Sequence, residues 1–145
     1  MEIPENTRKC IMKYLGVQTD VFFSKVDPML EKYKSQWRIS RVSFMPTNTV
    51  NLLFECDSEY YGNCVLKMCI PGPEAATEIN CLRAYDGHGY VKLWAYDLSD
   101  DILLLERVIP GSQMWTVTDY RERARLMAHR VKDLPVPWDG KNDFP

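Results

Sequence analysis

The sequence contains no run of about 18 apolar residues, the length that a membrane-spanning helix needs. Its first residues, Met1 to Glu5, lack the basic and then apolar stretch of a secretory signal. The chain carries 18 basic and 20 acidic side chains, a net charge of −2, so it lacks the basic excess that is typical of nucleic-acid binders. We therefore expect a protein that binds neither membranes nor nucleic acids.

Metal-ligand and disulfide patterns are also missing. The two histidines, His88 and His129, lie far apart and no CxxC pair occurs, so we expect no metal site. The five cysteines are an odd number, and Cys64 and Cys69 fall inside apolar runs, where a free cysteine acts as a small hydrophobic residue. We expect five reduced thiols and a cytoplasmic location.

A length of 145 residues, with 46% hydrophobic and 26% charged side chains, is typical of a globular domain with a sizeable core. The expected helices cover residues 7–15, 28–35, 74–85 and 115–132, and the expected strands cover residues 37–44, 50–56, 64–70, 90–96 and 101–108. Asp27 and Pro28 should cap and begin the second helix. This order predicts an α+β fold with a five-stranded, mainly antiparallel sheet and one helix crossing it.

Two charged residues interrupt otherwise apolar patterns. Lys67 lies in the apolar strand 64–70, and a buried unpaired charge is costly, so Lys67 either faces water on an edge strand or has a partner. Glu78 falls on the helix face that should meet the sheet, or at the rim of that face. Together they predict an ion pair between Lys67 and Glu78, which indicates a functional site more than it indicates stability.

A strand lysine held by a glutamate of the next helix, beneath a loop between two preceding strands, is typical of the phosphate-binding half of a kinase. Four segments, two of which contain Lys67 and Glu78, support this reading by their order and spacing: 65–67 (VLK), 78–83 (EINCLR), 87–93 (GHGYVKL) and 103–111 (LLLERVIPG). With these segments the chain resembles the aminoglycoside/hydroxyurea phosphotransferase family of the streptomycin-kinase type. The resemblance covers the chain from the region of residue 20 to its end.

The resemblance implies a protein-kinase-like fold of two lobes, with this chain supplying the N-terminal lobe. It implies that Lys67 holds the phosphates of ATP and that Glu78 orients Lys67. The other residues implied to contact ATP are Thr47, Asn48 and Thr49 in the loop over the phosphates, and Glu106, Arg107 and Val108, whose backbone would contact adenine. That loop departs from the kinase pattern because it has none of the glycines of GxGxxG, although backbone amides can still bind phosphate.

The family's H-x-D-x-x-x-x-N segment, which supplies the catalytic aspartate and a magnesium ligand, is absent from these 145 residues. We therefore expect no catalytic residue and no metal ligand in this chain, and magnesium only in a complete two-lobe enzyme. The expected parts are a helical extension (1–36), an ATP-binding lobe (37–111), and a helix and linker (112–145) leading toward an absent lobe.

Three functions remain open at this point. The chain is the ATP-binding lobe of a kinase that phosphorylates a hydroxyl of an aminoglycoside-like or hydroxyurea-like molecule, and is inactive alone. Alternatively, it is a non-catalytic interaction module, or an α+β domain of unrelated function. Apolar residues left bare without a second lobe, namely Ile109, Met114, Trp115 and Trp138, predict a homodimer.

Overall fold

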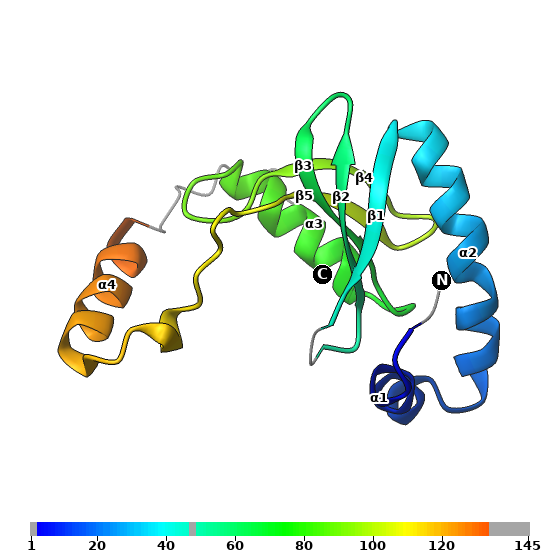
Figure 1. Cartoon of the computed structure of the whole chain (residues 1–145), viewed down its shortest axis with the longest axis horizontal. Coiled ribbons are helices and arrows are strands. Elements are labelled where there is room, and N and C mark those ends of the chain that lie inside the picture. Colours follow the sequence, from blue (N-terminus) through cyan, green and yellow to red (C-terminus); the bar gives the residue numbers. More distant parts are fainter. Residues whose placement is uncertain (1–2, 47–48, 134–145) are drawn as a thin grey trace.

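The computed structural model describes residues 3–46 and 49–133, and it shows helices on both sides of one sheet (Figure 1). The α-helices are α1 (Glu5–Leu15), α2 (Thr19–Gln36), α3 (Glu74–Tyr85) and α4 (Tyr120–Asp133). Two short 3-10 turns are η1 (Gly16–Gln18) and η2 (Met114–Thr116). The strands are β1 (Ile39–Met45), β2 (Leu52–Ser58), β3 (Gly62–Met68), β4 (Leu93–Asp97) and β5 (Ile102–Glu106).

The strands form one sheet in the order β1-β2-β3-β5-β4, and each neighbouring pair is antiparallel. The predicted α+β architecture with a five-stranded antiparallel sheet is therefore confirmed. In this order β3 is the middle strand, and β5 lies between β3 and β4. The edge strand β1 carries a bulge between Ser40 and Ser43, where Arg41 has a φ of 48°.

Alternation along the strands gives the sheet two faces that are covered by different helices. On the first face, strand residues share one core with α1 and α2, which includes Ile11, Phe22, Val26, Leu30, Tyr33, Leu52, Phe54, Leu66 and Leu104. On the second face, α3 packs through Ala75, Ile79 and Leu82. These three side chains meet Leu103 and Leu105 of β5. Helix α3 is thus the expected crossing helix, whereas the packing of α2 on the opposite face was not foreseen.

Helix α2 is longer than predicted, since it begins at Thr19 and contains Pro28 in its interior. The prediction that Pro28 begins this helix is wrong. Buried side chains at positions 22, 26, 30 and 33 form one continuous stripe through the proline. Burial of that stripe on the sheet outweighs the backbone hydrogen bond that the proline cannot make.

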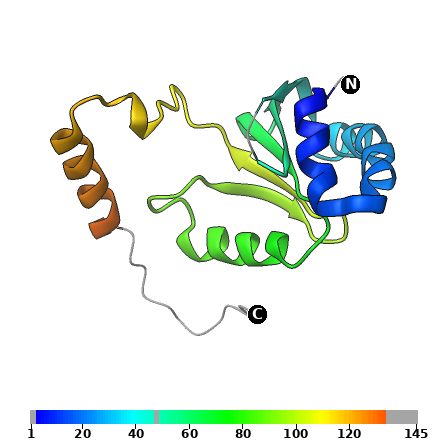
Figure 2. The ribbon, with the colours of Figure 1, turned by 90° about the horizontal axis from the view of Figure 1, so that it is seen from below.

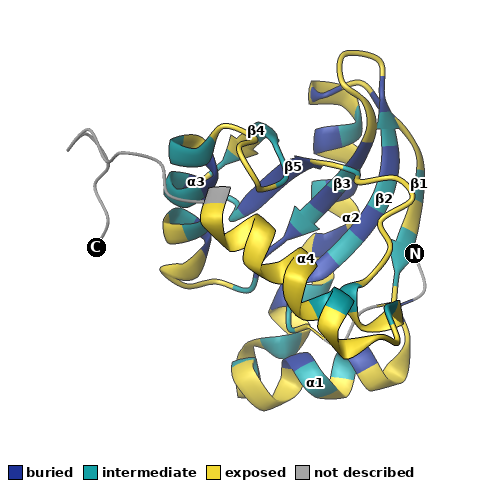
Figure 3. Cartoon of the chain, turned by 90° about the vertical axis from the view of Figure 1, so that its left-hand side faces the viewer, coloured by how far each residue is buried: buried dark blue, intermediate teal, exposed yellow. Residues whose placement is uncertain are grey.

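Helix α4 stands apart from the sheet (Figures 1 and 2), and its described side chains are all at least partly exposed (Figure 3). It begins at Tyr120, later than predicted, because Asp119 caps it: Asp119 Oδ1 accepts the backbone N–H groups of Arg121 at 2.8 Å and Glu122 at 3.3 Å. None of the helices within the described ranges is long and apolar enough to cross a membrane.

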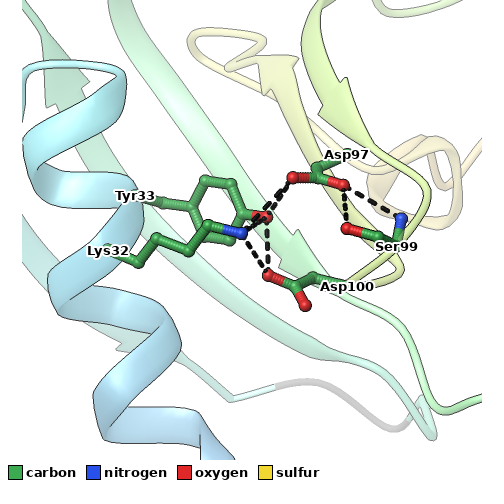
Figure 4. A network of polar contacts seen from close by, with 5 residues as sticks. All are labelled: Lys32, Tyr33, Asp97, Ser99 and Asp100. Atoms are coloured by element: carbon green, nitrogen blue, oxygen red, sulfur yellow. Dashed lines mark hydrogen bonds and ion pairs between the residues drawn. The ribbon is translucent and has the colours of Figure 1, made fainter.

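A polar cluster joins α2 to the turn between β4 and β5 (Figure 4). The Tyr33 hydroxyl lies 2.8 Å from one oxygen of Asp97 and 2.8 Å from one oxygen of Asp100. Lys32 Nζ donates to Asp100 at 2.7 Å, and Ser99 donates its hydroxyl and its N–H to the other oxygen of Asp97. The Ser99 hydroxyl, followed by the Tyr33 hydroxyl, lowers the pKa of Asp97 to about 2.

Candidate functional site

Lys67 and Glu78 form the predicted ion pair on the second face of the sheet. Lys67 projects from β3, which is a central strand, so the alternative of an edge strand in water is wrong. The Lys67 side chain is 15% exposed, whereas Glu78, at the rim of the buried face of α3, is 33% exposed. An inward charge on a central strand is thereby neutralised by the helix that crosses it.

Beside this ion pair lies a pocket of about 460 Å³, here called the sheet pocket. Its apolar walls come from the second face of the sheet and from the segment before β4, through Leu53, Val65, Leu105 and Val91. The remaining lining residues come from the end of β1, the loop after it, β3, and the end of β5 with the segment that follows: Met45, Thr49, Asn51, Lys67, Glu106, Arg107, Val108, Pro110 and Gly111. The pocket therefore joins an apolar wall to two basic residues, Lys67 and Arg107, an arrangement that suits a ligand with an apolar ring and an anionic group.

The loop between β1 and β2 closes one end of the sheet pocket. Thr49 lines it, and its hydroxyl donates to Asn51 O at 3.1 Å. Asn51 Oδ1 accepts the N–H of Ile70 at 3.1 Å, which fastens the loop to the end of β3 close to Lys67. Thr47 and Asn48 lie outside the described residues.

The opposite boundary is the segment that leaves β5. The N–H of Glu106 donates to Lys92 O at 2.8 Å, and the N–H of Arg107 donates to Asn63 O at 3.3 Å. Within the described residues, the N–H of Val108 donates to no protein acceptor. Val108 lines the sheet pocket, and its backbone N–H is therefore a donor that remains unpaired among the described residues.

Gly111 lets this segment turn back toward the pocket. Its φ is 63°, and a Cβ added there would lie 2.7 Å from Val108 O. A residue with a side chain would therefore be strained at this turn and would push against the backbone of Val108.

Glu78 does not line the sheet pocket. It borders a separate, mostly apolar hollow of about 680 Å³, between α3 and the segment before β4, whose other lining residues include Cys81, Leu82, Tyr90 and Val91. Glu78 thus reaches Lys67 from behind the sheet pocket, so it can orient the lysine without itself occupying the ligand space.

The thiol that lies near the ion pair, that of Cys69, is unreactive at neutral pH. Burial raises the pKa of the Cys69 thiol to about 11, so the thiol stays protonated at neutral pH and is a poor nucleophile. No disulfide forms among the five cysteines, all of which lie in the described ranges. Within those same ranges, no three His, Cys, Asp or Glu residues gather in a way that could hold a metal ion.

Of the residues predicted from sequence, the sheet pocket brings together Lys67, Thr49, Glu106, Arg107 and Val108. Sequence reasoning missed the apolar wall and Asn51. Strand alternation offered a signal for the wall, because Leu53 and Val65 share the strand face of Lys67. Asn51, directly before β2, had no distinguishing signal.

Comparison with known proteins shows that this chain is similar in sequence to two phosphotransferases. It is 24% identical over 140 residues to streptomycin 6-kinase of Streptomyces glaucescens, an alignment that covers 94% of the chain and 46% of that protein. It is 25% identical over 126 residues to hydroxyurea phosphotransferase of Kitasatospora aureofaciens, covering 87% of the chain and 37% of that protein. No family model matches the chain.

The chain thus spans less than half the length of either relative. The two relatives, a streptomycin kinase and a hydroxyurea phosphotransferase, are the kinds of protein that the resemblance named, and their identity to this chain is low. The curated relatives of this chain are phosphotransferases, as the resemblance predicted.

Proposed function

We propose that the chain is the ATP-binding, protein-kinase-like N-terminal lobe of a small-molecule kinase. The observation that supports this most directly is the sheet pocket, which gathers Lys67, the loop residue Thr49 and the segment 106–108 around one apolar wall. Phosphotransferase relatives at low identity support the same reading. Residues 37–111 would form the lobe and residues 1–36 a helical extension that completes its core.

In this proposal the adenine ring lies on Leu53, Val65 and Leu105, since a flat apolar ring gains by covering apolar side chains. The free N–H of Val108 donates to the edge of the base. The triphosphate points toward Lys67, whose position Glu78 fixes, and toward Thr47, Asn48 and Thr49. A lysine held by an ion pair loses less side-chain freedom when phosphate binds.

The acceptor in the proposed reaction is a hydroxyl group of an aminoglycoside-like or hydroxyurea-like molecule. Transfer requires an aspartate to receive the hydroxyl proton, and the 145 residues contain no H-x-D-x-x-x-x-N segment to supply it. Within the described residues, no group of three or more His, Cys, Asp or Glu side chains gathers in a way that could hold a metal ion. This chain is therefore expected to bind ATP without transferring its phosphate.

A titration of the purified chain with ATP, followed by NMR, tests the proposal. We expect a dissociation constant of about a millimolar, or roughly −4 kcal/mol, because half of a cleft buries little of the ligand. Lys67→Met should abolish the shifts, whereas Lys9→Met, which removes an exposed lysine of α1, should not. No ATP-dependent shift at the sheet pocket of the wild-type chain would contradict the proposal. Transfer of labelled γ-phosphate to an aminoglycoside by this chain would contradict its inactivity.

A second candidate function is a non-catalytic interaction module, favoured by the exposed apolar side chains between β5 and α4. Val108, Ile109 and Trp115 are exposed, and Met114 is partly exposed. Trp138 lies outside the described residues. Exposed apolar patches of this kind mark interaction surfaces, and the occupant we propose is a second copy of the chain.

A further inference from the structure

A smaller hollow of about 270 Å³ adjoins the sheet pocket and shares Arg107 with it. Four charged side chains, here called the charged strip, surround it: Arg41, Glu55, Asp57 and Arg107. They form two ion pairs, Arg41 with Asp57 at 2.5 Å and Arg107 with Glu55. The two positive and two negative charges of the strip cancel, so its side chains bind one another and do not form an anion site.

The two oxygens of Glu55 have separate partners. Ser43 donates its hydroxyl to Oε1 at 2.9 Å, while Oε2 pairs with the guanidinium of Arg107. Ser43 thus fixes the carboxylate from β1 and leaves the second oxygen directed at Arg107. Both Glu55 and Arg107 are half-buried, which makes their pairing less screened than one in open water.

Arg107 is the last anchored residue before the chain leaves the sheet. Its N–H donates to Asn63 O at 3.3 Å, a long hydrogen bond at the start of β3, and its side chain is held by Glu55 of β2. The next residues, Val108 and Ile109, are exposed and have no such hydrogen bond within the described residues. The placement of residues 108–111 therefore depends on the tie between Glu55 and Arg107.

We propose that Glu55 is a positioning residue for the nucleobase: through Arg107 it holds residues 108–111 at the boundary of the sheet pocket. This inference rests on the proposed function and deepens it, because it assigns base affinity to a strand residue that does not line the sheet pocket. The phosphate end depends on Lys67 and Glu78 instead, so the two ends of the ligand are held by independent ion pairs.

Loss of the tie should act locally. Exposed and half-exposed ion pairs contribute little to global stability, so neutralising Glu55 should leave the lobe folded. It should free residues 108–111 to sample positions in which the Val108 N–H no longer faces the base. Ligand affinity then falls by the fraction of time that the segment spends in the competent position.

The test compares ATP with tripolyphosphate, which lacks the base, in NMR titrations of Glu55→Gln, Arg107→Met and Arg107→Lys. We expect Glu55→Gln and Arg107→Met to weaken ATP binding about threefold, as suits a partly exposed ion pair, and to leave tripolyphosphate binding unchanged. Arg107→Lys keeps the charge and should retain most of the affinity. Arg41→Gln breaks the neighbouring pair of the strip without touching residue 107, and it is the matched control.

Amide hydrogen exchange gives a readout that needs no nucleotide. The amide of Arg107, whose N–H donates to Asn63 O, should exchange several times faster in Glu55→Gln than in the wild type or in Arg41→Gln, because this hydrogen bond opens more often once the Arg107 side chain is released. ATP affinity unchanged in Glu55→Gln, or a loss shared equally by tripolyphosphate, would overturn the inference. No ATP binding by the wild-type chain would instead overturn the proposed function. In that case equal exchange rates in the two chains would reject the tie, and faster exchange in Glu55→Gln would support it.

Discussion

The hydroxyl of Tyr33 lies 2.8 Å from a carboxylate oxygen of Asp97, sixty-four residues further along the chain. The same hydroxyl is 2.8 Å from Asp100, but it has only one proton and can donate to one carboxylate at a time. Lys32 Nζ donates to Asp100, and Ser99 donates its hydroxyl and its N–H to Asp97, so each carboxylate has a further donor besides Tyr33. This contact fastens α2 to the turn that precedes β5.

Tyr33→Phe should destabilise the fold by about 1–2 kcal/mol, because the two carboxylates lose a donor in a partly buried position. Urea unfolding followed by tryptophan fluorescence measures the change. Tyr14→Phe, at an exposed tyrosine of α1, is the control and should change nothing. Equal midpoints for the wild type and Tyr33→Phe would show that the hydroxyl contributes no stability.

Stability should fall as the pH drops from about 4 to 2, in part through Asp97. The pKa of this carboxyl is lowered to about 2 in the folded chain from an ordinary value of 3.8, mainly by the Ser99 hydroxyl. In that window the unfolded chain binds the proton more readily, so acid favours unfolding. Asp97→Asn should flatten the decline when unfolding midpoints are measured across this range. A decline equally steep in both chains would assign it to other carboxyls.

Removing the charge of Glu78 should lower the free energy of unfolding more than removing the charge of its partner Lys67. Glu78→Gln leaves Lys67, 15% exposed, without its counter-charge, whereas Lys67→Met leaves Glu78, 33% exposed, with access to water. We expect a loss of about 2 kcal/mol for Glu78→Gln and clearly less for Lys67→Met, since an uncompensated charge costs more the deeper it lies. Urea midpoints of the two variants test this order, and the reverse order would mean that Glu78 is the more deeply held partner.

Self-association should depend on the apolar residues that follow β5. Ile109→Ser combined with Trp115→Ser removes two exposed apolar side chains and should lower the apparent mass in light scattering at high protein concentration. Val17→Ser removes an exposed valine of η1, which is distant in sequence from the residues after β5, and should leave the apparent mass unchanged. A wild-type chain that remains monomeric at the highest concentration would contradict the proposed homodimer.

The sequence predicted the crossing helix, α3, with its observed bounds, and it predicted the pairing of Lys67 with Glu78. Both predictions rest on short-range periodicity: a charge at an apolar position is visible in a single element, and the next element supplied a charge of opposite sign. β1 begins at Ile39, two residues later than predicted, because Trp37 ends α2 and Arg38 has a φ of 50°. A change of backbone conformation of this kind leaves no trace in hydrophobic periodicity.

Contacts between distant segments could not be predicted from the sequence. Glu55 is an ordinary polar position within a strand, and Arg107 was expected to contact ATP through its backbone and not to pair through its side chain. Only the placement of β5 beside β3 brings the two side chains together. Likewise, nothing local distinguishes Tyr33 as the partner of Asp97. The apolar wall of the sheet pocket also required the strand order, since Leu105 joins Leu53 and Val65 only when β5 inserts into the sheet.

The bulge in β1 has a consequence for how chains meet one another. An edge strand presents a row of unpaired backbone groups on which a strand of another molecule can add. Here the row is interrupted between Ser40 and Ser43, and the charged Arg41 occupies the interruption. An incoming strand therefore finds no continuous ladder along β1 and meets the exposed, ion-paired side chain of Arg41, which protects this edge against amyloid-like stacking.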